Sequence, residues 1–294
     1  KPQTLYGAIV SQAGALSATV KALATDASGE SDLAVVWNGE TFTIAYQRVK
    51  TGGFDFAALR ADRSGNAVDP APIALTPTRY RDENPRLSWN GSDYLLVWQR
   101  WAITGSPTGE TCYPPQPPPP AELFAQRFSA AFALTGAEIP LAVTSANDNV
   151  PLDAENVDVS FLGGFWLVVW FVEGGSGAGT VRFARVDASG VRQEPLNGRP
   201  LTVTTQYDEP VLATAADGWI IAAHEGTRWG AGRGVALAHI SVNGIVTENE
   251  TVPIPATSAL EAFVLTPAPL VAFKRASSPV TFTGTLPRSR AVHR

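Results

Sequence analysis

A hairpin cassette that recurs along the chain constrains the fold more than any other feature. "SWNGSDYLLVWQR" (Ser88–Arg100) places Asn90 and Gly91 between two runs of alternating apolar residues. Asn and Gly both accept the positive φ that a two-residue turn requires, so this pattern predicts a β-hairpin. A single hairpin is marginal in water. The hairpin must therefore pack against other parts of the chain.

Four further copies of the cassette supply those parts. "VVWNGETFTIAYQR" lies upstream, and "VSFLGGFWLVVWF", "LATAADGWIIAAHE" and "FVLTPAPLVAFKR" lie downstream. The fourth of the five copies keeps the apolar alternation but has Thr214 and Ala223 where the first three copies carry two marker aromatics, and the fifth copy ends on Phe273. Each copy predicts two strands joined by a tight turn.

A second strand–turn–strand element follows each hairpin. It reads "FAALRADRSGNAV", "VRFARVDASGVR" and "VALAHISVNGIV", with "LFAQRFSAAFALTG" as the same unit carrying Phe132 in the glycine position. Gly65 and Gly190 are 125 residues apart, which is two periods of about 62, and Gly244 follows 54 residues later. Such a period predicts one four-stranded unit per repeat.

Four-stranded antiparallel units that repeat along a chain can bury both faces by stacking radially, as in a β-propeller. We therefore predict an all-β fold, with residues 1–294 forming a single propeller of five four-stranded blades. The innermost strands are expected in "DLAVVW", "NPRLSW", "ENVDVSF", "EPVLATA" and "LEAFVL". Strands from the N- and C-terminal ends would complete one blade and close the ring, and six blades are the alternative.

The aromatic residues of the first strands have a predicted role in this fold. Trp37, Trp89 and Phe161 hold equivalent places in three copies, and we expect them to fill the gaps between neighbouring blades. An exposed platform for stacking sugars is the other interpretation.

A proline-rich segment is the largest departure from the repeat. "WAITGSPTGETCYPPQPPPP" (residues 101–120) stands between the second and third strands of the second unit. Successive prolines favour polyproline II and prevent helix or sheet pairing, so this insertion is predicted to be a loop. One interpretation of this loop is a surface excursion. The other is a lid, or a docking segment for a partner that recognises proline-rich sequences.

Composition excludes several classes of function. The net charge is −5 with no basic stripe, which argues against nucleic acid as a partner. No apolar run reaches the roughly 18 to 20 residues that cross a bilayer, so no membrane insertion is expected. The single cysteine, Cys112, excludes an internal disulfide, and no Cys/His cluster could hold zinc. The chain has no methionine, which with the repeat style suggests a processed, exported protein at the cell surface or outside the cell.

Carboxylates gather in the connections that lead into the predicted innermost strands. In a propeller these connections converge on the mouth of the central channel, where a rigid scaffold carries recognition loops. The predicted ligand-binding residues at this rim are Asp32, Asp82, Glu83, Asp153, Glu155, Tyr207, Asp208, Glu209 and Glu261.

Three interpretations of these carboxylates are open. They cap backbone amides at blade turns; or they bind a ligand or a cation, Ca²⁺ being the ion that such a ring would attract; or two of them hydrolyse a glycosidic bond, with Glu83, Glu155 and Asp208 as the candidates. Against catalysis, the carboxylates repeat evenly, whereas a catalytic site breaks the symmetry of a repeat. No catalytic residue and no cofactor is therefore assigned.

A second, chemically varied patch is expected on the same rim. It lies in the connection "HEGTRWGAGR" and contains His224, Glu225, Arg228 and Trp229. An ordinary loop is the simpler interpretation of this segment. The "DRSG" and "DASG" stretches resemble fragments of calcium loops but lack further acidic ligands, so they are predicted to be turns.

The repeated cassette as a whole, with Trp-Asn-Gly, a second strand ending in "VVW" or "LVW", then "RxDxSG" and "IALT", resembles the repetitive propeller regions of large exported bacterial proteins. The resemblance implies a propeller and leaves the function open. We expect a non-enzymatic binding or adhesion module that takes a glycan, a cation or a protein at the acidic rim. A five-bladed propeller glycoside hydrolase with paired carboxylates is the alternative, and a structural spacer is the third reading.

Overall fold

The computed structural model describes residues 3–9, 16, 19–28, 33–50, 53–76, 81–101, 122–143, 157–173, 179–201, 207–225, 234–253, 260–265, 270–275 and 281–285. All regular structure in these ranges is β-strand. Within them, no helix is long and apolar enough to cross a membrane.

The strands form successive antiparallel units, called sheets I to V here. Sheets I and II are joined by one parallel bridge, between Phe54 and Arg81. Sheet I contains β3 (Leu33–Trp37), β4 (Phe42–Lys50), β5 (Gly53–Ala61) and β6 (Ile73–Ala74), and sheet II contains β7 (Arg81–Trp89), β8 (Asp93–Trp101), β9 (Glu122–Ser129) and β10 (Leu134–Ala142). Sheet III contains β11 (Asp158–Leu162), β12 (Phe165–Glu173), β13 (Gly179–Asp187) and β14 (Arg199–Pro200), and sheet IV contains β15 (Tyr207–Thr214), β16 (Gly218–Glu225), β17 (Gly234–Ser241) and β18 (Val246–Pro253). Sheet V contains β19 (Leu260–Leu265), β20 (Leu270–Arg275) and β21 (Thr281–Thr285).

The Asn-Gly turns explain why the first two strands of a sheet form where they do. Gly39 and Gly91 have φ values of 100° and 102°, which only glycine adopts without strain. The side-chain oxygen of Asn90 accepts hydrogen bonds from the amides of Ser92 and Asp93 at 2.8 and 2.7 Å. Asn38 binds the two amides after Gly39 in the same way. The cassette thus encodes both the bend and its internal hydrogen bonds.

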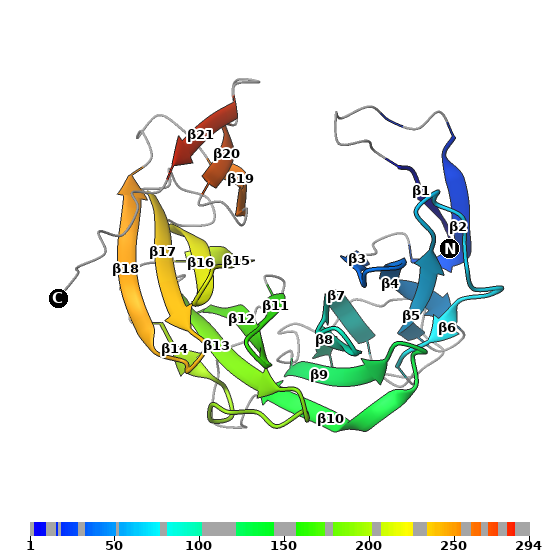
Figure 1. The fold of residues 1–294 in the computed structure, drawn as a ribbon, viewed down its shortest axis with the longest axis horizontal. Coiled ribbons are helices and arrows are strands. Elements are labelled where there is room, and N and C mark those ends of the chain that lie inside the picture. Colours follow the sequence, from blue (N-terminus) through cyan, green and yellow to red (C-terminus); the bar gives the residue numbers. More distant parts are fainter. Residues whose placement is uncertain are drawn as a thin grey trace.

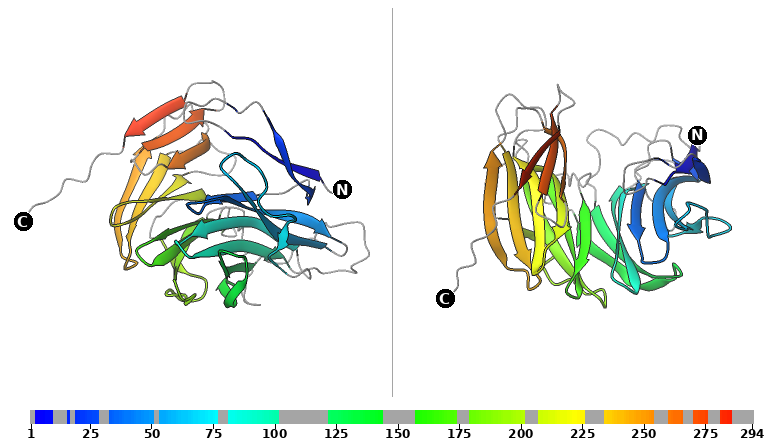
Figure 2. Two further views of the ribbon diagram at one scale, coloured as in Figure 1. Left: turned by 45° about the vertical axis from the view of Figure 1, so that its right-hand side comes forward. Right: turned by 45° about the horizontal axis from the view of Figure 1, so that its top comes forward.

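The sheets form an arc about a central axis, and the first strand of each lies nearest to that axis (Figure 1). Neighbouring innermost strands contact each other from β3 to β7, β11, β15 and β19. The two views of Figure 2 show the sheets following one another face to face along the chain. The all-β propeller predicted from the repeats is confirmed, and so is the assignment of its innermost strands.

The core lies between the sheets. One buried cluster joins sheets I and II, a second joins sheets II and III, and a third joins sheets III and IV. Tyr46, Trp98 and Trp170 hold the same place in the second strand of three sheets, and each is at most 1% exposed. Among the described residues, the largest fully buried side chains are therefore second-strand aromatics.

The aromatics of the first strands have a smaller share in this packing than the sequence predicted. Trp37, Trp89 and Phe161 are only partly buried. Each contacts the ring at the start of the next strand of its own sheet; for Trp89 and Tyr94 the ring centroids are 4.4 Å apart. Sheet IV, which has Thr214 in place of the first ring, keeps the second ring as the fully buried Trp219.

The N-terminal hairpin occupies the open side of sheet I. It contains β1 (Gln3–Gly7) and β2 (Lys21–Ala27), which pair with each other. Leu5, Leu23 and Ala24 pack against the face of sheet I that points away from sheet II, which is where a closing blade would lie. β2 pairs with β4 at one position, Ala27 with Arg48. Among the described strands, neither β1 nor β2 pairs with β21, so ring closure and the choice of five or six blades stay predictions.

The proline-rich insertion lies outside the described residues, apart from Trp101, which still belongs to β8. β8 and β9 flank the insertion and pair directly, Arg100 with Glu122. The insertion therefore joins the second and third strands of sheet II, as predicted.

Candidate functional site

The innermost strands carry a recurring irregularity close to their entrance. The register of β7 shifts between Glu83 and Arg86, and β15 and β19 shift at the equivalent places. In β7 the irregularity contains Asn84, whose φ is 55°. Bulges re-aim side chains and occur often next to functional sites. This end of the innermost strands is therefore the candidate functional site.

Buried amide side chains hold the entrance of β7 in place. Gln47 of sheet I donates from Nε2 to the carbonyl oxygen of Asp82 at 2.7 Å. Asn84 donates to Oε1 of the fully buried Gln99 at 2.8 Å. These bonds fix the backbone of the bulge from both neighbouring strands, which makes the channel entrance rigid.

Asp158, the first residue of β11, is a carboxylate on an innermost strand. Its two oxygens accept hydrogen bonds from the amides of Val159, at 2.8 Å, and Leu212 of β15, at 2.7 Å. The second bond joins sheet III to sheet IV. Burial raises the pKa of the Asp158 carboxyl, although both amides and the nearby Arg86 guanidinium favour the charged form.

Asp158 breaks the repeat. The pairing with the second strand places it at the position of Ala34 in β3, Arg86 in β7 and Val211 in β15. The first strands therefore carry one acid and one base at this level, on the neighbouring strands β11 and β7. Arg86 also donates to the carbonyl of Pro85 at 3.1 Å. A carboxyl with a raised pKa beside a fixed cation is a typical arrangement at functional sites.

Asp82 lies at the predicted rim, but its side chain is buried, whereas Asp158 is partly exposed. Asp82 is 1% exposed and pairs with Nε of Arg100 at 2.9 Å, and Arg100 also binds Glu138 at 2.9 Å. Burial raises the pKa of Asp82, and the Arg100 guanidinium opposes this effect. Asp82 therefore stabilises the packing of sheet II and does not face an incoming ligand. Glu83, the next residue, is partly buried at the edge of the bulge.

The remaining predicted site residues belong to two groups, those on described strands and those outside the described residues. Tyr207, Asp208 and Glu209 lie in β15 and Glu261 in β19, while His224 and Glu225 end β16; the structure gives only their backbone. Asp32, Asp153, Glu155, Arg228 and Trp229 lie outside the described residues. Asp208 stands directly before the bulge of β15, at the position that Glu83 holds in β7.

In the part of the chain that the structure describes, no three His, Cys, Asp or Glu residues are grouped to hold a metal ion. The expectation that Ca²⁺ binds at the rim depends on residues outside that part, and it stays a prediction.

Comparisons with known proteins support the fold. No family model and no curated protein matches the chain. A Trypanosoma rangeli sialidase in complex with sialic acid matches 93% of this chain and 46% of its own, at 10% identity and a TM-score of 0.51. A family 117 glycoside hydrolase from Zobellia galactanivorans covers 86% and 76% at 9% identity and a TM-score of 0.49. An exo-beta-1,3-galactanase from Clostridium thermocellum covers 92% and 57% at 10% identity and a TM-score of 0.47.

These comparisons correct the first functional interpretation. The repeats and the acidic rim suggested a non-enzymatic binding or adhesion module, whereas the similar structure with a TM-score above 0.5 is a sialidase. At these identities the likeness shows a shared fold. The chain spans less than half the length of the sialidase.

Proposed function

We propose that this protein is a glycoside hydrolase whose substrate binds at the channel mouth, with Asp158 as the general acid. The observation that carries the proposal is the place of Asp158 on an innermost strand, where the equivalent strands have no carboxylate, and burial raises its pKa. A general acid must hold its proton near neutral pH, and burial of a carboxyl is the usual way to achieve this. The proton on Asp158 would pass to the glycosidic oxygen as the bond to the leaving sugar breaks.

Glycoside hydrolysis requires a second carboxylate, which acts as nucleophile or activates water. Glu83 and Asp208 are the candidates, because they precede the bulges of β7 and β15, the two innermost strands on either side of β11. Each lies three residues before the residue that is equivalent to Asp158 in its own strand, which is Arg86 in β7 and Val211 in β15. By sequence count, Glu155 takes the same position in the third unit.

Two further observations support a hydrolase. Catalytic sites break the symmetry of a repeat, and Asp158 does so where Ala34, Arg86 and Val211 hold the equivalent positions. The fold is shared with a sialidase that was solved with sialic acid bound, which supports a glycan as the substrate class. Arg86 would lower the pKa of Asp158 and so set the pH range of activity.

The test is hydrolysis of a panel of 4-methylumbelliferyl glycosides and sialosides by the purified protein. We expect turnover of at least one member. Asp158→Asn should lower kcat by about 100-fold or more, the usual contribution of a general acid. Asp187→Asn is the matched control, because Asp187 accepts backbone hydrogen bonds in an outer turn and should leave kcat unchanged.

A structural role of Asp158 is separated from a catalytic one by the pH profile. Arg86→Gln removes the nearby positive charge, so the pKa of Asp158 should rise and the basic limb of kcat should move to higher pH. Loss of packing alone would lower kcat at every pH. Hydrolysis of no glycoside, or a wild-type rate for Asp158→Asn, would overturn the proposal.

A further inference from the structure

Three sheets carry an arginine at the same position of the third strand. Register with the second strand makes Arg60 of β5, Arg127 of β9 and Arg185 of β13 equivalent. In sheets I and III an acid nine residues later receives this arginine. Asp69 accepts from the amide and the guanidinium of Arg60, and Glu194 does the same for Arg185, with Nε to Oε1 at 2.7 Å.

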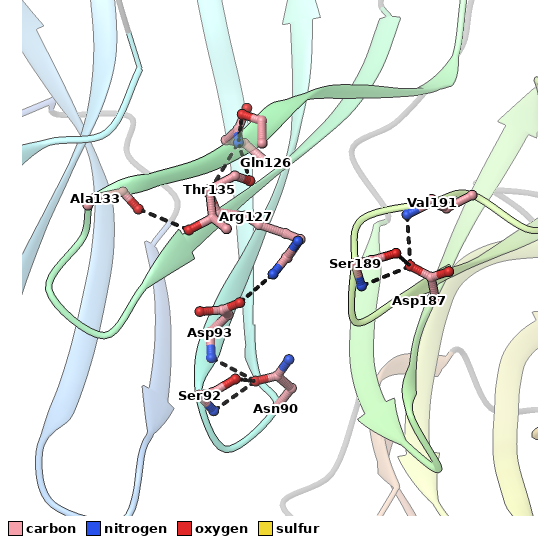
Figure 3. Close-up of polar contacts among 11 residues, drawn as sticks. Asn90, Ser92, Asp93, Gln126, Arg127, Ala133, Thr135, Asp187, Ser189 and Val191 are labelled. Atoms are coloured by element: carbon pink, nitrogen blue, oxygen red, sulfur yellow. Dashed lines mark hydrogen bonds and ion pairs between the residues drawn. The ribbon is translucent and has the colours of Figure 1, made fainter.

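Sheet II lacks this acid. Position 136, nine residues after Arg127, is a glycine with φ of 80°, and β9 instead pairs with β10 at Thr135. The guanidinium of Arg127 turns to Asp93, with Nη2 to Oδ2 at 2.5 Å (Figure 3). Its Nε is buried and finds no acceptor among the described residues. In sheet II the arginine therefore pairs with a carboxylate from the neighbouring strand, and only its Nε lacks the acceptor that the equivalent arginines have.

A pocket of about 380 Å³ lies next to this arginine, between sheets II and III. The 187–191 turn of sheet III faces Arg127 across it (Figure 3), and a Cβ added to Gly190 would lie 3.2 Å from Cδ of Arg127. Further lining residues are Thr135, Glu138, Ser189 and Arg192.

The charges that line this pocket favour an anion. Arg192 donates to the main-chain carbonyls of Glu194 and Pro140 and has no carboxylate partner among the described residues. The carboxylate of Glu138 accepts from Arg100. Arg127 is neutralised by Asp93, so Arg192 supplies the net positive charge of the pocket lining.

From this geometry we infer that the pocket between sheets II and III binds the carboxylate of a small ligand, such as an acidic sugar. The ligand carboxylate accepts hydrogen bonds from the Arg127 guanidinium on the side that Asp93 does not occupy. Asp69 in sheet I and Glu194 in sheet III accept from the equivalent arginines in the same way. Arg192 stabilises the charge of the ligand carboxylate. Planar guanidinium groups bind carboxylates with good geometry. The pocket is formed by outer strands and a turn of sheet III, so it is separate from Asp158 on its innermost strand.

The probe is glucuronate, with glucose and acetate as comparison ligands. Titration is followed by NMR on the arginine Nε–H signals, the Arg127 signal being the one lost in Arg127→Lys. Saturable shifts with glucuronate alone indicate an acidic sugar, and equal shifts with acetate indicate a bare carboxylate; both support the inference. Equal binding of glucose, or no binding of glucuronate at millimolar concentration, contradicts it.

Two variants test the geometry. Arg192→Gln should weaken glucuronate binding about 10-fold, because it removes a charge-assisted hydrogen bond. Gly136→Asp should abolish binding by supplying the missing carboxylate; a Cβ at position 136 meets no atom within 4 Å, and Asp tolerates positive φ. Arg63→Gln is the control for net charge and should bind as wild type.

The results of these binding experiments do not depend on the result of the hydrolysis assay. Asp158→Asn should bind glucuronate in this pocket as tightly as wild type. If both Arg192→Gln and Gly136→Asp, folded as judged by circular dichroism, bind as wild type, the pocket is not a carboxylate site.

Discussion

Replacing Trp170 tests whether sheet-to-sheet packing stabilises this fold. Its indole is fully buried between sheets II and III, and a tryptophan buries up to about 250 Å². At about 25 cal/mol per Å² this is worth about 6 kcal/mol. Trp170→Ala keeps the part due to the Cβ and leaves a cavity, so we expect a loss of about 4 kcal/mol in the free energy of unfolding.

A second substitution separates ring volume from hydrogen bonding. The Nε1 of Trp170 has no acceptor among the described residues. Trp170→Phe therefore loses three heavy atoms but no hydrogen bond, and should cost about 2 kcal/mol at roughly 0.8 kcal/mol per carbon. Trp37→Ala, at a partly buried ring, is the matched control and should cost less than Trp170→Ala.

The assay is urea denaturation followed by far-UV circular dichroism, which does not depend on the replaced chromophore. Trp170→Ala should lower the free energy of unfolding more than Trp170→Phe does. If Trp170→Ala costs no more than Trp37→Ala, or if Trp170→Phe costs as much as Trp170→Ala, the packing argument is refuted.

Three further predictions use the same denaturation assay. Arg100→Gln leaves Asp82 without its cation, so the free energy of unfolding at pH 7 should fall by about 3–5 kcal/mol. The double variant with Asp82→Asn should recover part of this loss. The pKa of Asp158 is raised in the folded protein, so protonated Asp158 stabilises the fold fully below about pH 4, and this stabilisation is lost as the pH rises through the folded-state pKa. The free energy of unfolding should fall by about 1.4 kcal/mol for each unit by which the pKa is raised. Asp158→Asn should remove this pH dependence. Gly198→Ala would place a Cβ 2.4 Å from the Trp170 indole at φ of 67° and should destabilise the protein by more than about 1 kcal/mol, whereas Ala at Gly91, where no atom lies within 4 Å, should cost only the backbone strain.

The order of strands could be predicted from the sequence because its signals are local. Each Asn-Gly turn and the alternation around it fix a hairpin without reference to distant residues, as the bonds of Asn38 and Asn90 show. The burial of individual aromatics could not be predicted as well, because it depends on the face that a neighbouring sheet covers. Trp98 and Trp170 are covered, while Trp89 is partly open.

The candidate site was harder to predict, because the acidic signal in the sequence lies in the connections, whereas Asp158 lies within a strand. Asp158 stands in "VDVSF", where a carboxylate in an alternating strand suggests a solvent-facing position. Only the approach of sheet IV places the Leu212 amide against it. Alignment of the repeats held a signal, since Ala34, Arg86 and Val211 take the equivalent positions. Export to the cell surface stays a prediction.

The pKa of the Asp158 carboxyl, measured by ¹³C NMR on aspartate-labelled protein, tests a catalytic role for the channel most directly. We predict a titration above the ordinary aspartate value of about 3.9, moving further upward in Arg86→Gln. An ordinary or lower value for Asp158, unchanged in Arg86→Gln, would contradict a general acid at this position.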